Sequence, residues 1–290
     1  MAIWNLGSIN IDHVYRLARL PEPGETVQAL GLELGLGGKG ANQSIAAARA
    51  GAPVRHLGAM GAGDGWVIDR LTAAGVDCCG VDRLSGVPTG HAIIMVDRAA
   101  ENTIVVHSGA NRHLDPARIA AALTGMSAGD TLLLQNETAL QVEAAAQARA
   151  QGVRVVYSAA PFDPEALRRV LPHVSVLALN EHEAAALEAA TGGVPSVPAM
   201  LVTRGAAGAE YRDLATDRVI REPAFAVQPV DTTGAGDCFA GWFAAGLDRG
   251  EPVETALRHA AAAAAIQVTR AGAGDAMPDR AEVMAFLSGR

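Results

Sequence analysis

The chain has 290 residues, half of them hydrophobic, and a formal net charge of −8. This length and composition predict an α/β protein with a sizeable core, organised as a single domain over residues 1–290. The acidic balance and the lack of Lys/Arg runs disfavour nucleic acid as a partner, because phosphate-backbone binding needs a clustered basic face. The three cysteines match neither a disulfide framework nor a zinc site, so we expect reduced thiols in the cytoplasm.

Membrane association is also not expected. Residues 1–7 lack the basic segment of a signal peptide and indicate a first strand. Further along the chain, every long apolar run is interrupted by glycine or charge before it reaches membrane-spanning length.

Short β-branched or leucine-rich runs alternate with alanine-rich segments along the chain. The runs predict strands over residues 2–7, 54–59, 131–135, 153–157, 174–179 and 199–203. The alanine-rich segments predict helices over residues 39–50, 65–74, 115–123, 138–151, 164–170, 181–190, 236–248, 253–268 and 279–287. This alternation favours a mostly parallel sheet with helices on both faces.

Residues 12–34 and 86–107 break this rhythm. Within the second stretch, residues 92–97 and 103–107 flank a turn, which predicts a β-hairpin. We expect these segments to form a small antiparallel sheet that stands off the main one. The alternative is an edge hairpin on the main sheet.

The segment Asp231–Asp237, Asp-Thr-Thr-Gly-Ala-Gly-Asp, opens directly onto an apolar helix. Unpaired amides at a helix start attract anions, and glycines let a phosphate approach the backbone. A carboxylate beside such an anion hole is suited to deprotonate an acceptor hydroxyl. Both Asp231 and Asp237 are candidates, and Asp237 is favoured because it lies at the helix start.

A glycine cluster over residues 35–40 formally contains the dinucleotide fingerprint, but it does not follow the first strand. A P-loop is excluded because Lys39 is followed by Gly40 and not by Ser or Thr. The cluster predicts a flat glycine platform whose Asn42 faces a polyol, or a tight turn that begins the helix.

Two Asn-acid pairs follow predicted strands. Asn10 and Asp12 share one face of an extended segment and could bind vicinal hydroxyls or form an Asx turn. Asn180 and Glu183 could hold the waters of a magnesium ion, or could cap the helix that they begin. The two interpretations of the second pair are compatible.

The two long motifs occur together with several shorter ones. Gly-Gly-Lys-Gly-Ala-Asn at 37–42, with Ala-Gly at 50–51, precedes Asp-Thr-Thr-Gly-Ala-Gly-Asp at 231–237. Shorter runs are Gly-Ser-Ile-Asn-Ile-Asp at 7–12, Pro-Gly-Glu-Thr-Val at 23–27 and His-Ser-Gly-Ala-Asn at 107–111. In this order, and over nearly the whole chain, the sequence resembles the ribokinase-like (PfkB) sugar kinase family.

The resemblance implies a three-layer α/β fold with a β lid, and ATP-dependent phosphorylation of a primary hydroxyl of a small sugar, with ribose as first candidate. Asp237 would be the catalytic base, and the anion hole would be formed by the amides of Gly234, Ala235, Gly236 and Asp237. The sugar contacts carried over are Asn10, Asp12, Gly38, Lys39, Asn42 and Glu137. The nucleotide would be bordered by Asn180, Thr203, Arg204, Gly205, Gly208, Gly236 and His259, with the 268–274 loop.

The resemblance also implies cations and a partner. Mg²⁺ with ATP would be held through water by Asn180 and Glu183. A potassium ion would be held by Asp231 and by carbonyls of Thr233, Arg270 and Gly272. Ala276 replaces a serine that the family commonly has in this loop, and Asp275 is the candidate substitute. The lid would join two subunits into a homodimer.

The acceptor is not settled by these motifs. The 184–199 connection is short, which predicts that one peripheral helix of the family is lost or shortened. Residues 158–161 are Ser-Ala-Ala-Pro where the family usually has Asn-Pro-Ala-Pro. Deoxyribose, fructose, other pentoses and nucleosides therefore stay open as acceptors. A catalytically silent sugar-binding regulator and a nicotinamide dehydrogenase are the competing functions, and the intact Asp237 motif argues against the first.

Overall fold

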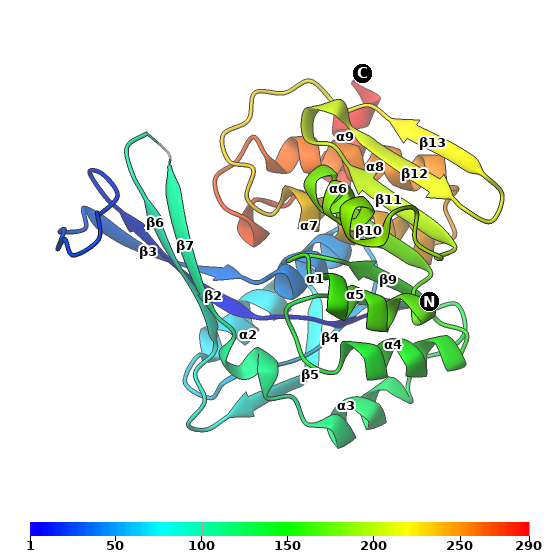
Figure 1. Cartoon of the computed structure of the whole chain (residues 1–290), viewed down its shortest axis with the longest axis horizontal. Helices are drawn as coiled ribbons and strands as arrows, with labels where there is room; N and C mark the ends of the chain where they lie inside the picture. The colour runs from blue at the N-terminus through cyan, green and yellow to red at the C-terminus, as the bar shows by residue number, and fades with distance from the viewer. Residues whose placement is uncertain (100, 290) are drawn as a thin grey trace.

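A nine-stranded sheet forms the body of the molecule in the computed structural model, which describes residues 1–99 and 101–289 (Figure 1). The strand order is β13-β12-β11-β10-β9-β8-β1-β4-β5. All neighbouring pairs are parallel except β11–β12 and β12–β13. The strands are β1 (Ile3–Leu6), β4 (Val54–Gly61), β5 (Val76–Leu84), β8 (Thr131–Gln135), β9 (Arg154–Ser158), β10 (Val176–Asn180), β11 (Ala199–Thr203), β12 (Ala209–Asp213) and β13 (Arg218–Glu222).

Helices cover both faces of this sheet, because its central strands are apolar on both sides. Along β1, Ile3 packs into one core cluster and Trp4 and Leu6 into the other. The first cluster is covered by α1 (Lys39–Arg49), α2 (Gly65–Ala73), α7 (Ala235–Asp248), α8 (Val253–Gln267) and α9 (Arg280–Ser288). The second is covered by α3 (Pro116–Leu123), α4 (Gln141–Ala150), α5 (Pro164–Val170) and α6 (Glu181–Thr191).

The order of the parallel strands reverses at β1. From β1 the sheet grows through β4 and β5 on one side and through β8 to β11 on the other. Ligands of open α/β sheets bind beyond the carboxyl ends of the strands at such a reversal. The segments that follow β1 and β8 are therefore positioned to form a site.

A second sheet projects from the body as a lid (Figure 1). Its strands, in the order β3-β2-β6-β7, are β2 (Asn10–Arg16), β3 (Gly31–Gly37), β6 (Gly90–Val96) and β7 (Asn102–His107). The expected separate sheet and the β6–β7 hairpin are confirmed, and the alternative edge hairpin is wrong. The lid is not wholly antiparallel, because β2 and β6 pair in parallel.

The sequence-based elements agree with the structure except at the margins of the main sheet. Each predicted strand and helix is present with ends shifted by a few residues. The strands β5, β12 and β13 were not predicted. They lie at or next to the two edges of the sheet, and their charged residues obscure the apolar pattern on which the prediction depended.

Within the described residues, the helices are too short or too polar to cross a bilayer.

Candidate active site

The candidate site lies where the first residues of α1 contact the segment that follows β1. The amide of Ala41 donates to the carbonyl of Ser8 at 2.8 Å, and the amide of Gly40 donates to Ser8 Oγ at 3.1 Å. A Cβ atom on Gly40 would overlap the backbone of Gly7, so only glycine permits this approach. The first turn of α1 is thereby fixed beside the reversal point of the sheet.

This placement brings two α1 amides to the carboxylate of Asp237. Asn42 Nδ2 and Gln43 Nε2 each donate to one Asp237 oxygen at 3.1 Å. Asp237 lies in the first turn of α7 and is 8% exposed. The two donors hold both carboxylate oxygens, so the orientation of Asp237 is fixed before any substrate binds.

The start of α7 also offers backbone donors. The amides of Gly234, Gly236 and Asp237 have no hydrogen-bond partner among the described residues. The amide of Ala235 donates to the carbonyl of Thr232 at 3.2 Å. The N-cap Gly234 has φ 77°, a conformation that glycine adopts without strain. Free amides at a helix start beside a carboxylate are the arrangement that the predicted anion hole requires.

A chain of buried, hydrogen-bonded carboxamide side chains links Gln43, which binds Asp237, to the strands β1 and β8. Gln135 Nε2, from the end of β8, donates to Gln43 Oε1 at 2.8 Å and to Asn5 Oδ1 at 3.0 Å. Asn5 Nδ2 in turn donates to the carbonyl of Gly40 at 2.8 Å. Sequence analysis missed this chain. The available signal was a polar residue within each of two otherwise apolar strands.

The lid and the body each contribute polar groups to the predicted sugar side of the site. Glu137 accepts from the hydroxyl of Ser8 and from the amide of Lys39, the latter at 3.1 Å. On the lid, Asn10 Oδ1 accepts from Asn111 Nδ2 at 2.8 Å. Asn111, which the sequence analysis did not single out, orients Asn10 in this way.

The glycine platform faces Asp12. A Cβ atom on Gly37 would overlap the Asp12 carboxylate, and Gly38 has φ 91°. These glycines join the end of β3 to α1, so they connect the lid to the body and do not form a dinucleotide fingerprint after the first strand. The tight turn that begins the helix is confirmed, with Gly38 as the N-cap of α1, and the polyol-facing interpretation stays a prediction.

Three acids and one lysine interact electrostatically here. Burial, with a smaller effect of the Glu137 charge, raises the pKa of Asp12 to about 6. Burial also raises the pKa of Glu137. The negative charge of Asp237 raises the pKa of Lys39 against the opposing effect of burial. Lys39 therefore partly balances the carboxylates that converge on the sugar side.

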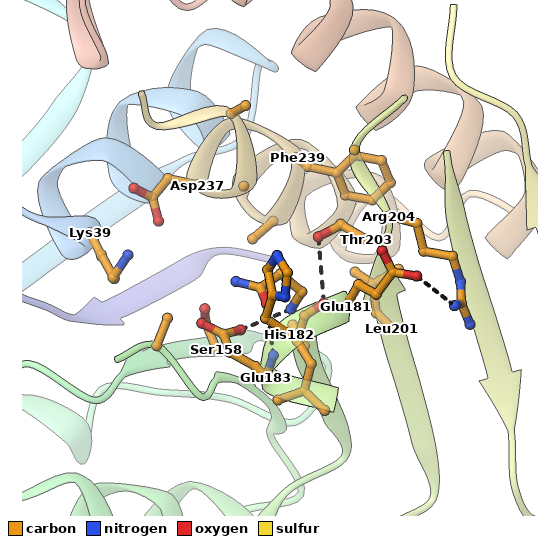
Figure 2. Close-up of a pocket in the computed structure, with 18 of the residues that line it drawn as sticks. Lys39, Ser158, Glu181, His182, Glu183, Leu201, Thr203, Arg204, Asp237 and Phe239 are labelled. Carbon is orange, nitrogen blue, oxygen red and sulfur yellow. Dashed lines mark hydrogen bonds and ion pairs between the residues drawn. The ribbon is translucent and has the colours of Figure 1, made fainter. Parts of the chain in front are cut away.

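A cleft of about 470 Å³ extends from this cluster across the ends of β10 and β11. Figure 2 shows Asp237 and Lys39 at one end and Arg204 at the other. The predicted nucleotide residues that line it are Asn180, Thr203, Arg204, Gly205 and Gly236. The structure does not bring two others to it. The Gly208 carbonyl accepts from the Arg204 amide at 2.8 Å within a turn, and His259 Nδ1 lies 3.1 Å from Glu251.

Asn180 and Glu183 form a reciprocal cap at the start of α6. Asn180 Oδ1 accepts from the Glu183 amide, and Glu183 Oε2 accepts from the Asn180 amide, each at 2.8 Å. The capping interpretation is confirmed. Both residues also line the cleft, and Glu183 keeps a second carboxylate oxygen for a water ligand. Within the described residues, no group of three His, Cys, Asp or Glu side chains is placed to hold a metal directly.

The loop that begins at Asp231 is tied to the loop that follows α8. The two Asp231 oxygens accept from the amides of Thr233 and Gly272, each at 2.9 Å. Burial alone would raise the pKa of Asp231, but these amides hold it below its ordinary value. The carbonyls of Thr233 and Gly272 both accept from Nε2 of Gln267, at 2.7 and 3.1 Å. Sequence analysis did not identify Gln267.

The expectation that Asp275 replaces the missing serine at a cation site is wrong. The Asp275 side chain is 68% exposed, and its carboxylate pairs with Arg70 Nη1 at 2.5 Å. It therefore points to the surface. The guanidinium of Arg270, next to the same loop, pairs with Glu282 at 2.5 Å.

The raised pKa of Asp12 predicts a pH-dependent cost to stability. Between pH 4 and 6, folded Asp12 holds a proton that the unfolded chain has released, so above pH 6 the folded state must bear a buried charge. Asp12→Asn should leave stability nearly unchanged at pH 4 and raise it by up to about 3 kcal/mol at pH 7. Urea unfolding of both proteins across this range measures the difference. A stability difference that does not change with pH would contradict the assignment.

Comparison with known proteins agrees with this geometry. The pfkB family carbohydrate kinase model matches residues 3–280. The ribokinase of Haemophilus influenzae is 37% identical over 302 residues, covering 97% of each chain, and the deoxyribokinase of Salmonella typhi is 30% identical over 310 residues, covering 99% of each. The structure of Arabidopsis thaliana ribokinase complexed with ribose and ATP superposes with a TM-score of 0.86 at 30% identity, over 99% of both chains. The chain belongs to the pfkB family of carbohydrate kinases.

Proposed function

We propose that this carbohydrate kinase is a ribokinase, which transfers the γ-phosphoryl group of ATP to the primary hydroxyl of ribose to give ribose 5-phosphate. One observation carries the proposal: Asn42 and Gln43 hold the Asp237 carboxylate beside the free amides of the α7 start, close enough for its charge to act on Lys39 and Glu137. A carboxylate and free amides therefore lie together at the start of one helix, as base-assisted transfer of a phosphoryl group to a hydroxyl requires. The ribokinase and deoxyribokinase relatives support a pentose acceptor.

In the proposed mechanism, Asp237 accepts the proton of the sugar hydroxyl as the hydroxyl oxygen attacks. Asn42 and Gln43 orient the carboxylate, which leaves a lone pair directed at the acceptor. The amides of Gly234, Gly236 and Asp237 stabilise the charge that spreads over the transferring phosphoryl oxygens. The preorganised donors need no rearrangement during the reaction.

The sugar would be held by hydroxyl contacts on both sides. Asn42 lies beside Asp237, to which its Nδ2 donates, and is the sugar contact that the family resemblance implies there. Asp12 on the lid and Glu137 on the body are acceptors, and the ammonium of Lys39 is a donor. A polyol has several hydroxyl groups to pair with these side chains, whereas an aromatic base would require an apolar stacking surface.

The cleft between Asp237 and Arg204 would hold the nucleotide. Asn180, Thr203 and Gly205 line it, and Figure 2 shows Arg204 at the end away from Asp237 and Lys39. Mg²⁺ fits at the start of α6, where Glu183 keeps a free oxygen beside Asn180 to hold metal-bound water. When bound, the ion would neutralise negative charge on the β- and γ-phosphate oxygens.

A coupled assay of ADP release across a sugar panel tests the proposed acceptor. Ribose should give a kcat/KM at least about tenfold above those of 2-deoxyribose, fructose and inosine, because a site built to pair a hydroxyl discriminates against an acceptor that lacks or misplaces it. A higher kcat/KM for any of the other three would replace ribose as the acceptor. Release of ADP without phosphorylated sugar would contradict kinase function.

Removal of the base should separate turnover from binding. Asp237→Asn keeps the size of the side chain and should lower kcat roughly 10²–10⁴-fold. Sugar binding, followed by calorimetry, should change little, because Asn42 and the sugar-side acids remain. Glu188→Gln, an exposed change further along α6, is the control for non-specific loss. Near-normal turnover of Asp237→Asn would show that another group takes the proton.

We also propose that two copies of the chain pair through the lid. One row of neighbouring residues crosses all four lid strands and consists of Leu34, His13, Ile93 and Val105. Strand alternation puts this row on the face opposite Asp12. Leu34 and Val105 are 54% and 57% exposed, which is unusual for large apolar side chains gathered on one sheet. A second copy would cover this face.

Sedimentation velocity at micromolar concentration tests the pairing. The wild-type chain should sediment as a dimer, and Leu34→Asp should shift it to monomer, because a buried unpaired carboxylate opposes association. Val219→Asp on β13, where the valine is 43% exposed outside the lid, is the matched control and should stay dimeric. A monomeric wild-type protein would contradict the proposal.

A further inference from the structure

A single glutamine side chain fills the space between the two loops that precede and face the anion hole. Gln267 is the last residue of α8 and is 0% exposed. Its Nε2 donates to the Thr233 carbonyl at 2.7 Å and to the Gly272 carbonyl at 3.1 Å. One amide group thus bridges the segment that leads into α7 and the segment that leaves α8.

The orientation of this amide is set by the two carbonyls. Oε1 of Gln267 is buried and has no hydrogen-bond partner among the described residues. Exchanging the positions of nitrogen and oxygen would direct an acceptor at two other acceptors and would lose both hydrogen bonds. The unpaired oxygen is therefore tolerated so that the NH₂ group can face the loops.

Other contacts tie the same two loops together around Gln267. The Asp231 carboxylate accepts the amides of Thr233 and Gly272. The carbonyl of Val268 accepts the amides of Val230 and Asp231, at 2.7 and 3.1 Å. Gly234 follows directly after Thr233, so the position of the Thr233 carbonyl helps to set the direction of the first free amides of α7.

These residues do not fit the potassium ion that the resemblance implies. Such an ion would need the carbonyl oxygens of Thr233 and Gly272, and both are directed at the hydrogens of the Gln267 amide. Those hydrogens carry partial positive charge, so a cation within contact distance of the same oxygens would be repelled and would have to displace the side chain. Ala276 supplies no side-chain oxygen, and Asp275 is paired with Arg70.

We infer that the Gln267 amide takes the place of a monovalent cation and makes catalysis by this enzyme independent of potassium. Two N–H donors on one nitrogen satisfy the two carbonyls that an ion would otherwise coordinate, and they join the loops without added charge. Gln267 touches no substrate and is a positioning residue for the α7 amides. The inference rests on the proposed phosphoryl transfer for its kinetic part.

The first experiment compares the wild-type enzyme in KCl and in tetramethylammonium chloride at equal ionic strength, with nucleotide supplied as the tetramethylammonium salt. Turnover in the two salts should differ by less than about twofold, because no ion is needed to order the loops. The thermal unfolding midpoint should also be the same in both salts, because an ion that does not bind the folded state cannot stabilise it. Potassium-specific activation or stabilisation of the wild-type enzyme would overturn the inference.

The second experiment creates the missing ion site. Gln267→Ala removes the donor and leaves two carbonyls beside the Asp231 carboxylate. In tetramethylammonium chloride, kcat should fall roughly tenfold, because the α7 amides lose their orientation. Potassium should restore most of this loss and should raise the unfolding midpoint of the variant alone. Gln151→Ala is the matched control, because Gln151 also follows a helix and donates to a carbonyl, that of Leu123 at 3.2 Å.

The remaining outcomes are also decisive. Full activity of Gln267→Ala without potassium, or a loss that potassium restores in neither activity nor melting, would show that Gln267 has no cation-like role. Gln267→Glu keeps the shape and removes the donor, so it provides the same comparison if the alanine variant does not fold. A wild-type enzyme that phosphorylates no sugar in either salt would contradict the proposed function, and the melting comparison would still decide the ion question.

Discussion

The contact between the backbone of Gly40 and that of Gly7 and Ser8 determines the geometry of the whole site. Because neither chain segment has a Cβ at the closest point, α1 begins almost in contact with the segment that follows β1. Within the first turn of this helix, Asn42 and Gln43 are thereby placed within hydrogen-bonding distance of Asp237. A side chain at Gly40 would move α1 outward, and the carboxylate would lose both donors together.

The parts of this structure that were predictable share a local cause. Helix and strand positions follow from residue periodicity, and the free amides at the start of α7 follow from small residues at a helix start. The Asn180–Glu183 pair is an example. The same two residues cap α6 and line the cleft, and their spacing in the sequence indicates both roles. Each of these motifs depends only on residues that lie close together in the sequence.

The parts that were not predictable depend on which distant segments meet. Gln267 ends a long alanine-rich helix and resembles an ordinary terminal residue until the loop of Thr233 is placed against it. The pairing of Gln135 with Gln43 joins residues 92 positions apart. Asp275 fits a cation site by sequence position alone, but a turn directs it to Arg70. Strands β12 and β13 were missed because an edge position relaxes the need for apolar residues on both faces.

The buried chain of Asn5, Gln135 and Gln43 has a consequence for the fate of the proton. Carboxamides neither gain nor lose protons near neutral pH, so a proton on Asp237 has no relay through the body of the enzyme. A proton would instead leave Asp237 toward its titratable neighbours Lys39 and Glu137 or toward the cleft that Asp237 lines. As the proposed base, Asp237 would therefore be regenerated on the cleft side of the site and not through the amide chain that holds it.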